Sequence, residues 1–219
     1  MLDDQLRAQY PELRISASNV GSLGGLVALK RQEAHIIGTH LLDPATGQYN
    51  LPDLKKQKLL SQVVVMNLVI REQGLIIPKG NPKKIKGIQD LARKDVTFIN
   101  RQPGAGTRIL LDYKLSKLKI APEHIRGYQR EEVTHMAVAV AVASGLADTG
   151  LGVKSAAKAL GLDFVSIERE DYDLVFLKDF FDSVMGQKLV TVIRSDAFKH
   201  AVEQLDGYDT KKTGMIKKA

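Results

Sequence analysis

Short apolar runs alternate along this chain with segments whose apolar residues recur at helical spacing. Runs rich in Val, Ile, Leu and Phe predict strands at residues 13–17, 34–40, 62–77 (interrupted at Gly74), 96–100, 147–151, 164–167 and 174–177. Helical spacing predicts helices at residues 2–9, 88–93, 132–144, 155–160, 180–186 and 197–205. Two more helices are predicted to follow Gly-rich turns, one ending at Lys30 and the other near Leu118. Strands that alternate with helices are typical of an α/β fold.

Two Gly-rich turns lie where a predicted strand gives way to a predicted helix, at residues 19–25 and 103–107. Such a turn directs free backbone N–H groups and the positive end of the helix dipole at an anion. Ser22 and Thr107 add hydroxyl donors. Neither turn continues into the Gly-Lys-Ser/Thr of a phosphate loop, and each alone is compatible with a plain helix cap. Two in one chain favour a ligand site in a cleft.

More candidate residues surround the second turn. Gly106 lets the backbone approach a ligand closely, and Arg108 adds a full positive charge. Asn100 and Arg101 end the preceding strand, and ligands of open α/β sheets bind at the carboxyl ends of strands. Arg101 either faces that ligand or pairs with a surface carboxylate.

Two histidines, His35 and His40, belong to the predicted strand 34–40. Five positions apart in a strand, they point to opposite faces, so we expect no shared metal ion. His40, at the end of the strand, is the ligand candidate, and His35 is expected to be structural. No metal site is predicted.

The segment Glu131–His135 precedes an Ala/Val-rich helix. Thr134 or Glu132 could cap that helix, and Thr134 is also a candidate ligand contact. Glu132 with His135 invites an acid/base interpretation, but no nucleophile accompanies them, so no catalytic residue is assigned. Arg71 is either a ligand clamp or an ion-pair partner. Tyr172 either donates its hydroxyl to a ligand or lies in a hinge.

Composition narrows the classes of function. Cysteine is absent, which excludes disulfides and thiolate chemistry, and the net charge of +7 favours anionic partners. No nucleic-acid-binding motif is present, so direct nucleic-acid binding is not expected. The longest apolar run, residues 136–143, is too short to span a bilayer, and no export signal is visible. We therefore expect a cytoplasmic protein without membrane insertion and without a cofactor.

Six segments together resemble a known group of proteins. They are NVGSLGGL (19–26), HLLDP (40–44), REQGLI (71–76), NRQPGAGTR (100–108), EEVTH (131–135) and ADTGLG (147–152). Their order and spacing resemble the periplasmic-binding-protein-like domain found with molybdopterin-biosynthesis (MoeA-type) enzymes and with helix-turn-helix regulators of the LysR type. More distantly, the two turns are similar to those of tungstate- and molybdate-binding transport proteins.

This resemblance implies a two-lobed type II binding-protein fold, with a mixed sheet in each lobe and the ligand cleft between the lobes. One lobe would comprise residues 1–75 and 173–219, and the other residues 76–172. The expected ligand is a small anion, such as molybdate, tungstate or a molybdenum-cofactor-related compound. Ser22, Arg101, Thr107 and Arg108 become the main binding candidates. The strand and Ser-His-Asp-like turn that usually open such a domain have no counterpart after Met1, so one lobe would lack a sheet edge.

Three functions remain open at this point. The chain is a ligand-binding or sensing module, a subunit or enzyme of molybdopterin biosynthesis, or the effector domain of a transcription regulator without its DNA-binding part. The expected partner is accordingly a fused or separate biosynthetic enzyme or a DNA-binding domain.

Overall fold

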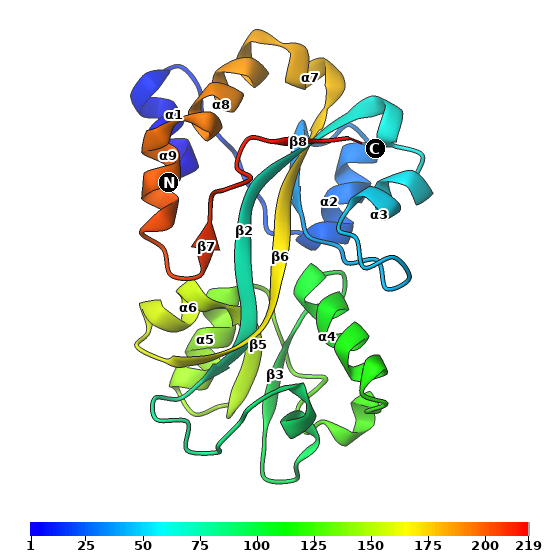
Figure 1. Cartoon of the computed structure of the whole chain (residues 1–219), viewed down its shortest axis with the longest axis vertical. Coiled ribbons are helices and arrows are strands. Elements are labelled where there is room, and N and C mark those ends of the chain that lie inside the picture. Colours follow the sequence, from blue (N-terminus) through cyan, green and yellow to red (C-terminus); the bar gives the residue numbers. More distant parts are fainter. Residues whose placement is uncertain (219) are drawn as a thin grey trace. The chain divides into compact units, whose positions relative to one another are not determined.

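The computed structural model describes residues 1–218 and divides the chain into two compact units. The first unit comprises Met1–Ile70 and the chain from Asp171 onwards, and the second comprises Arg71–Glu170. The chain passes between the units twice, inside the 15-residue strands β2 (Val63–Ile77) and β6 (Asp163–Leu177). Both long strands are visible in Figure 1.

The first unit packs helices around the ends of these two strands. β1 (Ile36–Thr39) is antiparallel to the last part of β6, and β8 (Ile216–Lys217) is antiparallel to the first part of β2. The short strand β7 (Tyr208–Asp209) also pairs with β2. The helices of this unit are α1 (Leu2–Gln9), α2 (Gly21–Lys30), α3 (Leu51–Lys56), α7 (Lys178–Asp182), α8 (Val184–Arg194) and α9 (Asp196–Glu203).

Serine caps and one apolar cluster hold the first unit together. Ser183 and Ser195 accept hydrogen bonds from backbone N–H groups in the first turns of α8 and α9. The apolar faces of these helices meet the sheet in a buried cluster that includes Met66, Phe176 and Ile193. Packing of this cluster, more than intrinsic helix propensity, stabilises such short helices.

The second unit places three helix N-termini along one edge of its sheet. β3 (Phe98–Arg101) is parallel to β4 (Glu131–Glu132) and to β5 (Thr149–Val153), and β5 is antiparallel to β2. Each parallel strand is followed by a helix: α4 (Gly106–Lys117), α5 (His135–Ala143) and α6 (Lys154–Ala159). Figure 1 shows α4 beside β3 and α5 beside β5. The helices therefore begin at the carboxyl edge of the parallel strands, where open α/β sheets bind ligands.

Two interruptions expected from the sequence do not occur. β2 continues through Gly74, where a Cβ atom would lie 2.2 Å from the Val165 carbonyl oxygen. Gly74 therefore allows a close approach of β6 and does not break the strand. The expected strands 164–167 and 174–177 are one strand, β6, because its polar middle finds partners. Glu170 accepts hydrogen bonds from Arg71 and Gln73, so burial does not leave its charge unpaired.

The strand expected at residues 13–17 is not formed. The backbone N–H of Ile15 donates to the Asp3 carboxylate at 2.7 Å, so it is satisfied by a side chain and not by a neighbouring strand. Leu13 and Ile15 still pack against the first unit's core. The alternating pattern thus reflects packing of an irregular segment. The predicted helix 180–186 is also divided, because Ser183 ends α7 and caps α8.

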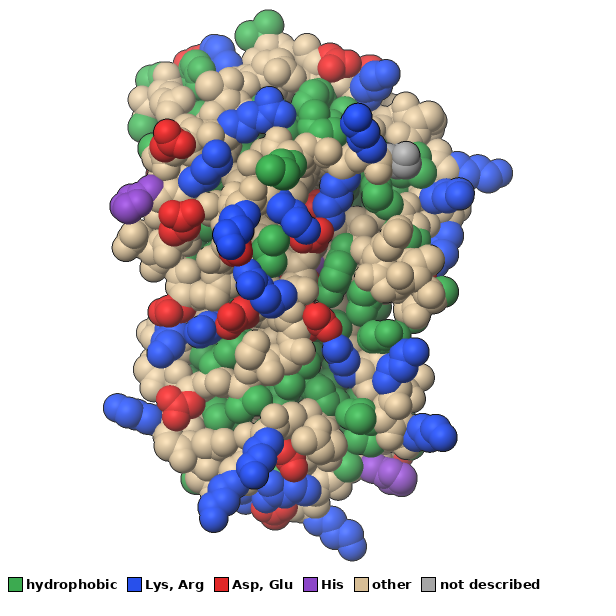
Figure 2. Space-filling model, viewed as in Figure 1, with side chains coloured by type: hydrophobic (Ala, Val, Ile, Leu, Met, Phe, Trp, Pro, Cys, Tyr) green, Lys and Arg blue, Asp and Glu red, His purple; other side chains and the backbone are tan. Residues whose placement is uncertain are grey.

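Within residues 1–218, no helix combines the length and apolarity needed to cross a bilayer. Figure 2 shows lysine and arginine side chains spread over the viewed surface, with acidic side chains between them.

Candidate functional site

Arg101 ends β3 and lies buried at the carboxyl edge of the second unit's parallel strands. Its Nη2 donates to the Val133 carbonyl at 2.7 Å, and its Nε lies 3.2 Å from the Glu132 carbonyl and 3.1 Å from Gln102 Oε1. Its Nη1 lies 3.1 Å from His135 Nδ1. All of these partners are uncharged acceptors. Among the described residues, no carboxylate pairs with this guanidinium.

The electrostatic environment of Arg101 is unfavourable for its charge. Burial, followed by repulsion from the nearby Arg71 guanidinium, lowers the pKa of Arg101 from its ordinary value to about 10. A guanidinium carries five N–H groups, and the contacts above use one on each of its three nitrogens. Two N–H groups therefore remain available to an acceptor.

Thr107 lies in the first turn of α4 and is 1% exposed. The residue before this helix, Ala105, offers no side-chain cap. The first N–H groups of a helix have no partner within the helix. Among the described residues outside α4, none accepts a hydrogen bond from the backbone N–H of Gly106 or Thr107. The amino end of α4 thus presents backbone donors beside the Thr107 hydroxyl.

A buried chain of polar groups joins Thr107 to Arg71. The Nε2 atom of Gln73 donates to Thr107 Oγ1 at 2.8 Å and to Glu170 Oε1 at 3.0 Å. Arg71 Nε donates to the same Glu170 oxygen and forms an ion pair with it. Thr107 and Arg71 therefore lie close together in the second unit. Arg101 lies near them, because its guanidinium is repelled by that of Arg71.

The start of α5 is ordered by two interactions. Thr134 Oγ1 accepts a hydrogen bond from the Ala137 N–H at 3.0 Å, so Thr134 supplies the cap that was expected of Thr134 or Glu132. Because Arg101 can only donate, His135 Nδ1 must accept, which places the imidazole proton on Nε2. It is the backbone carbonyl of Glu132, and not its carboxylate, that contacts Arg101.

Arg108 is held differently from Arg101. Its guanidinium forms ion pairs with Glu131 at 3.0 Å and Asp112 at 3.3 Å, and it lies 4.2 Å from the centre of the Tyr128 ring. It also donates to the Arg101 carbonyl at 3.1 Å. The charge of Arg108 is therefore compensated within the unit, while its side chain braces the turn between β3 and α4.

Comparisons with known proteins identify the family of this chain. A family model described as a PBP superfamily domain matches residues 3–194. The chain belongs to this family, the PBP superfamily domains. YvgK of Bacillus subtilis strain 168 is 38% identical over 196 residues, which are 90% of this chain and 63% of YvgK. This PBP domain thus spans less than two thirds of the length of YvgK.

Solved structures share the fold of this PBP domain. A Clostridium perfringens protein that holds bound phosphate, classed as a phosphate ABC transporter substrate-binding protein, has a TM-score of 0.65 at 13% identity. The alignment covers 93% of this chain and 90% of that one. The regulatory domain of CcmR from Synechocystis PCC6803, in complex with 2-PG, has a TM-score of 0.64 at 15% identity, covering 88% and 87% of the two chains. The α/β fold of the PBP domain is therefore that of periplasmic-binding-protein-like proteins.

The remaining sequence candidates belong to the first unit. Ser22 lies in the first turn of α2 and is buried, and its Oγ accepts a hydrogen bond from the His40 N–H at 3.4 Å. The His40 ring lies 5.6 Å from the Tyr172 ring, and Tyr172 in turn packs over Gly38, where a Cβ atom would lie 2.1 Å from its hydroxyl. Ser22, His40 and Tyr172 are therefore neighbours within the first unit.

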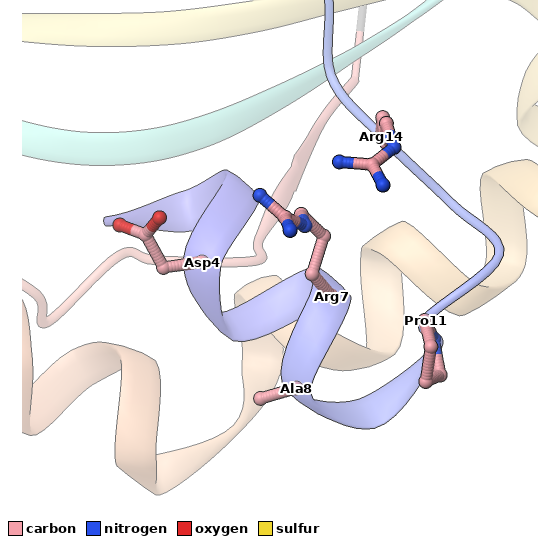
Figure 3. A pocket seen from close by; sticks show the side chains of 5 residues that line it. All are labelled: Asp4, Arg7, Ala8, Pro11 and Arg14. Carbon is pink, nitrogen blue, oxygen red and sulfur yellow. The ribbon is translucent and has the colours of Figure 1, made fainter.

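Surface shape alone does not locate the candidate residues. A pocket of about 510 Å³ in the first unit is lined by Asp4, Arg7, Ala8, Pro11 and Arg14, which Figure 3 shows as sticks. A second pocket, of about 340 Å³, lies in the second unit beside Lys154, Lys158 and Phe164. No candidate residue from the sequence lines either of these two pockets.

Sequence reasoning did not assign Gln73 or Glu170 a role. Both are almost fully buried polar residues in long strands that are otherwise largely apolar on their buried side. A polar residue at a buried strand position is itself a signal, because it must find a partner or bind a ligand. The sequence therefore contains a signal at Gln73, but it does not show that the partners of Gln73 are Thr107 and Glu170.

Proposed function

We propose that this PBP domain binds a small oxyanion through Arg101, the Thr107 hydroxyl and the backbone N–H groups at the amino end of α4. The observation that carries the proposal is the buried Arg101 guanidinium, which has no carboxylate partner among residues 1–218 and is repelled by Arg71. Several kcal/mol are lost when a charge is buried without a counter-charge. An oxyanion would supply that counter-charge.

The donors suit an anion by chemistry as well as by charge. Two N–H groups of Arg101, one hydroxyl and the first N–H groups of α4 all donate. Charge-assisted hydrogen bonds of this kind are shorter and stronger than neutral ones. In the first unit, Ser22, His40 and Tyr172 are proposed as further ligand contacts, as are Arg71, Gly106, Arg108 and Thr134 in the second.

The identity of the oxyanion is a finer proposal. The Clostridium perfringens neighbour holds phosphate, and the CcmR regulatory domain holds 2-PG. Molybdate and tungstate are proposed as further candidates on the sequence motifs alone. Tetrahedral oxyanions present similar acceptors to the same donors, so discrimination among them rests on size and on protonation.

A ligand panel tests the proposal. Phosphate, sulfate, molybdate and tungstate at millimolar concentration are added separately to the purified protein, with chloride at equal ionic strength as the control. A ligand present at a hundred times its Kd stabilises by about 2.7 kcal/mol, so we expect at least one oxyanion to raise Tm by several degrees. If all four match chloride in thermal shift and in native mass spectrometry, the proposal is wrong.

A second function is proposed for the protein that contains this domain, namely transcription regulation with the domain as its effector part. The fold neighbour CcmR is described as a regulatory domain, and the chain spans only 63% of YvgK. Such a regulator would act in the cytoplasm, which cell fractionation would test. A helix-turn-helix pattern in the reading frame that precedes the domain would support it, and an unrelated upstream gene would count against it.

A role in molybdopterin biosynthesis remains the alternative suggested by the sequence motifs. It predicts that replacing Glu132 and His135 together abolishes complementation of a cofactor-deficient strain. Full complementation by the double variant would reject acid/base catalysis by this pair.

A further inference from the structure

We propose that Gln73 determines the specificity of the oxyanion site by committing the Thr107 hydroxyl to the role of donor. The inference rests on the proposed function, because it concerns the same site. It identifies Gln73 as a positioning residue that acts through Thr107, and it names the ligand class favoured there: an oxyanion whose oxygen at Thr107 bears no proton.

Glu170 fixes the orientation of the Gln73 amide. Glu170 Oε1 accepts from Arg71 Nε, and the resulting ion pair keeps this buried carboxylate ionised. An ionised carboxylate only accepts hydrogen bonds. The Gln73 atom 3.0 Å from it must therefore be the amide nitrogen, and not the carbonyl oxygen.

The carbonyl oxygen of the same amide has no hydrogen-bond partner among the described residues. Gln73 is fully buried. Leaving a buried acceptor unsatisfied is unfavourable. The amide nitrogen nevertheless donates two hydrogen bonds, to Glu170 and to Thr107. These two hydrogen bonds therefore fix the orientation of the amide.

The hydrogen bond from Gln73 also restricts the direction of the Thr107 hydroxyl proton. Because Gln73 Nε2 donates to Thr107 Oγ1 at 2.8 Å, that oxygen acts as the acceptor and its own proton must point elsewhere. Within residues 1–218, no acceptor for this proton is found. Gln73 thus converts a hydroxyl that could donate or accept into an obligatory donor.

The consequence is selectivity for ligand protonation. At this position Thr107 and the backbone N–H groups of α4 can only donate. An oxyanion oxygen that carries a proton would therefore find no acceptor for that proton. Sulfate and molybdate carry no proton at neutral pH, whereas phosphate does. A hydroxyl that is free to rotate would accept a ligand proton, so loss of the Gln73 amide should relax this selectivity.

The test compares four proteins by calorimetry with sulfate, molybdate and phosphate at pH 7: the unchanged protein, Gln73→Met, Thr107→Ser and Thr107→Val. Methionine has nearly the shape of glutamine but cannot donate. We expect Gln73→Met to shift the affinity ratio of sulfate to phosphate about tenfold toward phosphate. Thr107→Ser should keep the original ratio, and Thr107→Val should weaken all three anions.

A double variant separates a positioning role from a merely structural one. If Gln73 acts through Thr107, adding Gln73→Met to Thr107→Val should leave the affinity ratio unchanged. An unaltered ratio in the single Gln73→Met variant, with binding still present, overturns the inference while the proposed function stands. If the unchanged protein binds none of the three anions, the proposed function itself has failed.

Discussion

Replacing Arg101 with methionine separates the energetic roles of this residue. In the folded protein the pKa of Arg101 is lowered to about 10, which corresponds to about 3 kcal/mol of unfavourable burial and repulsion. Methionine removes that cost. It also removes the hydrogen bond to the Val133 carbonyl, whose loss costs about 1–3 kcal/mol. The Glu132 carbonyl keeps a second donor, the Gln102 N–H.

These opposing contributions nearly cancel in the unliganded protein. We therefore expect Arg101→Met to change the free energy of unfolding by no more than about 2 kcal/mol. Binding should respond very differently. The two remaining N–H groups of Arg101 would form charge-assisted bonds to an oxyanion at about 1.5–3 kcal/mol each. Their loss weakens binding by about 10²- to 10⁴-fold.

The assay combines urea unfolding without ligand and calorimetric titration with the oxyanion that binds the unchanged protein. Arg126→Met is the matched control, because Arg126 is an exposed arginine of the same unit. It removes the same net charge, and we expect an affinity within twofold of the original. Binding by Arg101→Met within threefold of that control would refute the assignment. A loss of stability above about 4 kcal/mol would refute the cancellation.

Substitutions at three further positions test the fold. Gly74→Ala places a methyl group against the Val165 carbonyl and should cost about 3 kcal/mol in urea unfolding; a neutral effect would show that the strands can separate there. Thr134→Ala should cost about 1 kcal/mol by loss of the α5 cap, and Thr134→Ser should restore most of it. Hydrogen bonding from Lys56, and then from the Thr46 N–H, lowers the Asp43 pKa from 3.8 to about 2. The ionised Asp43 carboxylate therefore stabilises the folded protein above pH 4, and this contribution is lost as the pH falls toward 2. Asp43→Asn should flatten the stability profile in that window, and an unchanged profile would contradict this assignment.

The sequence contained enough to predict the α/β class and the position of the candidate donors. The alternation of apolar strands with amphipathic helices is local information, and so is the Gly-rich turn before α4. Because β3 ends at Arg101 and α4 begins at Gly106, the link between strand end and helix start could be inferred without knowing any long-range contact.

Continuity of the two long strands could not be inferred locally. Gly74 resembles a strand breaker, and the acidic middle of β6 resembles a loop. Both interpretations fail because the partner of each residue lies far away along the chain. Gly74 meets Val165, and Glu170 meets Arg71 and Gln73.

By itself, the sequence determined which groups could donate to an anion: Arg101, Thr107 and the backbone of the turn between them. Only the tertiary structure decided which of these groups are already engaged. Arg108 is neutralised by Glu131 and Asp112, whereas Arg101 has only uncharged partners among the described residues. The physical reason is that a charge is compensated by neighbours in space, and pairs such as Gln73 with Thr107 or Arg71 with Glu170 join residues 34 and 99 positions apart.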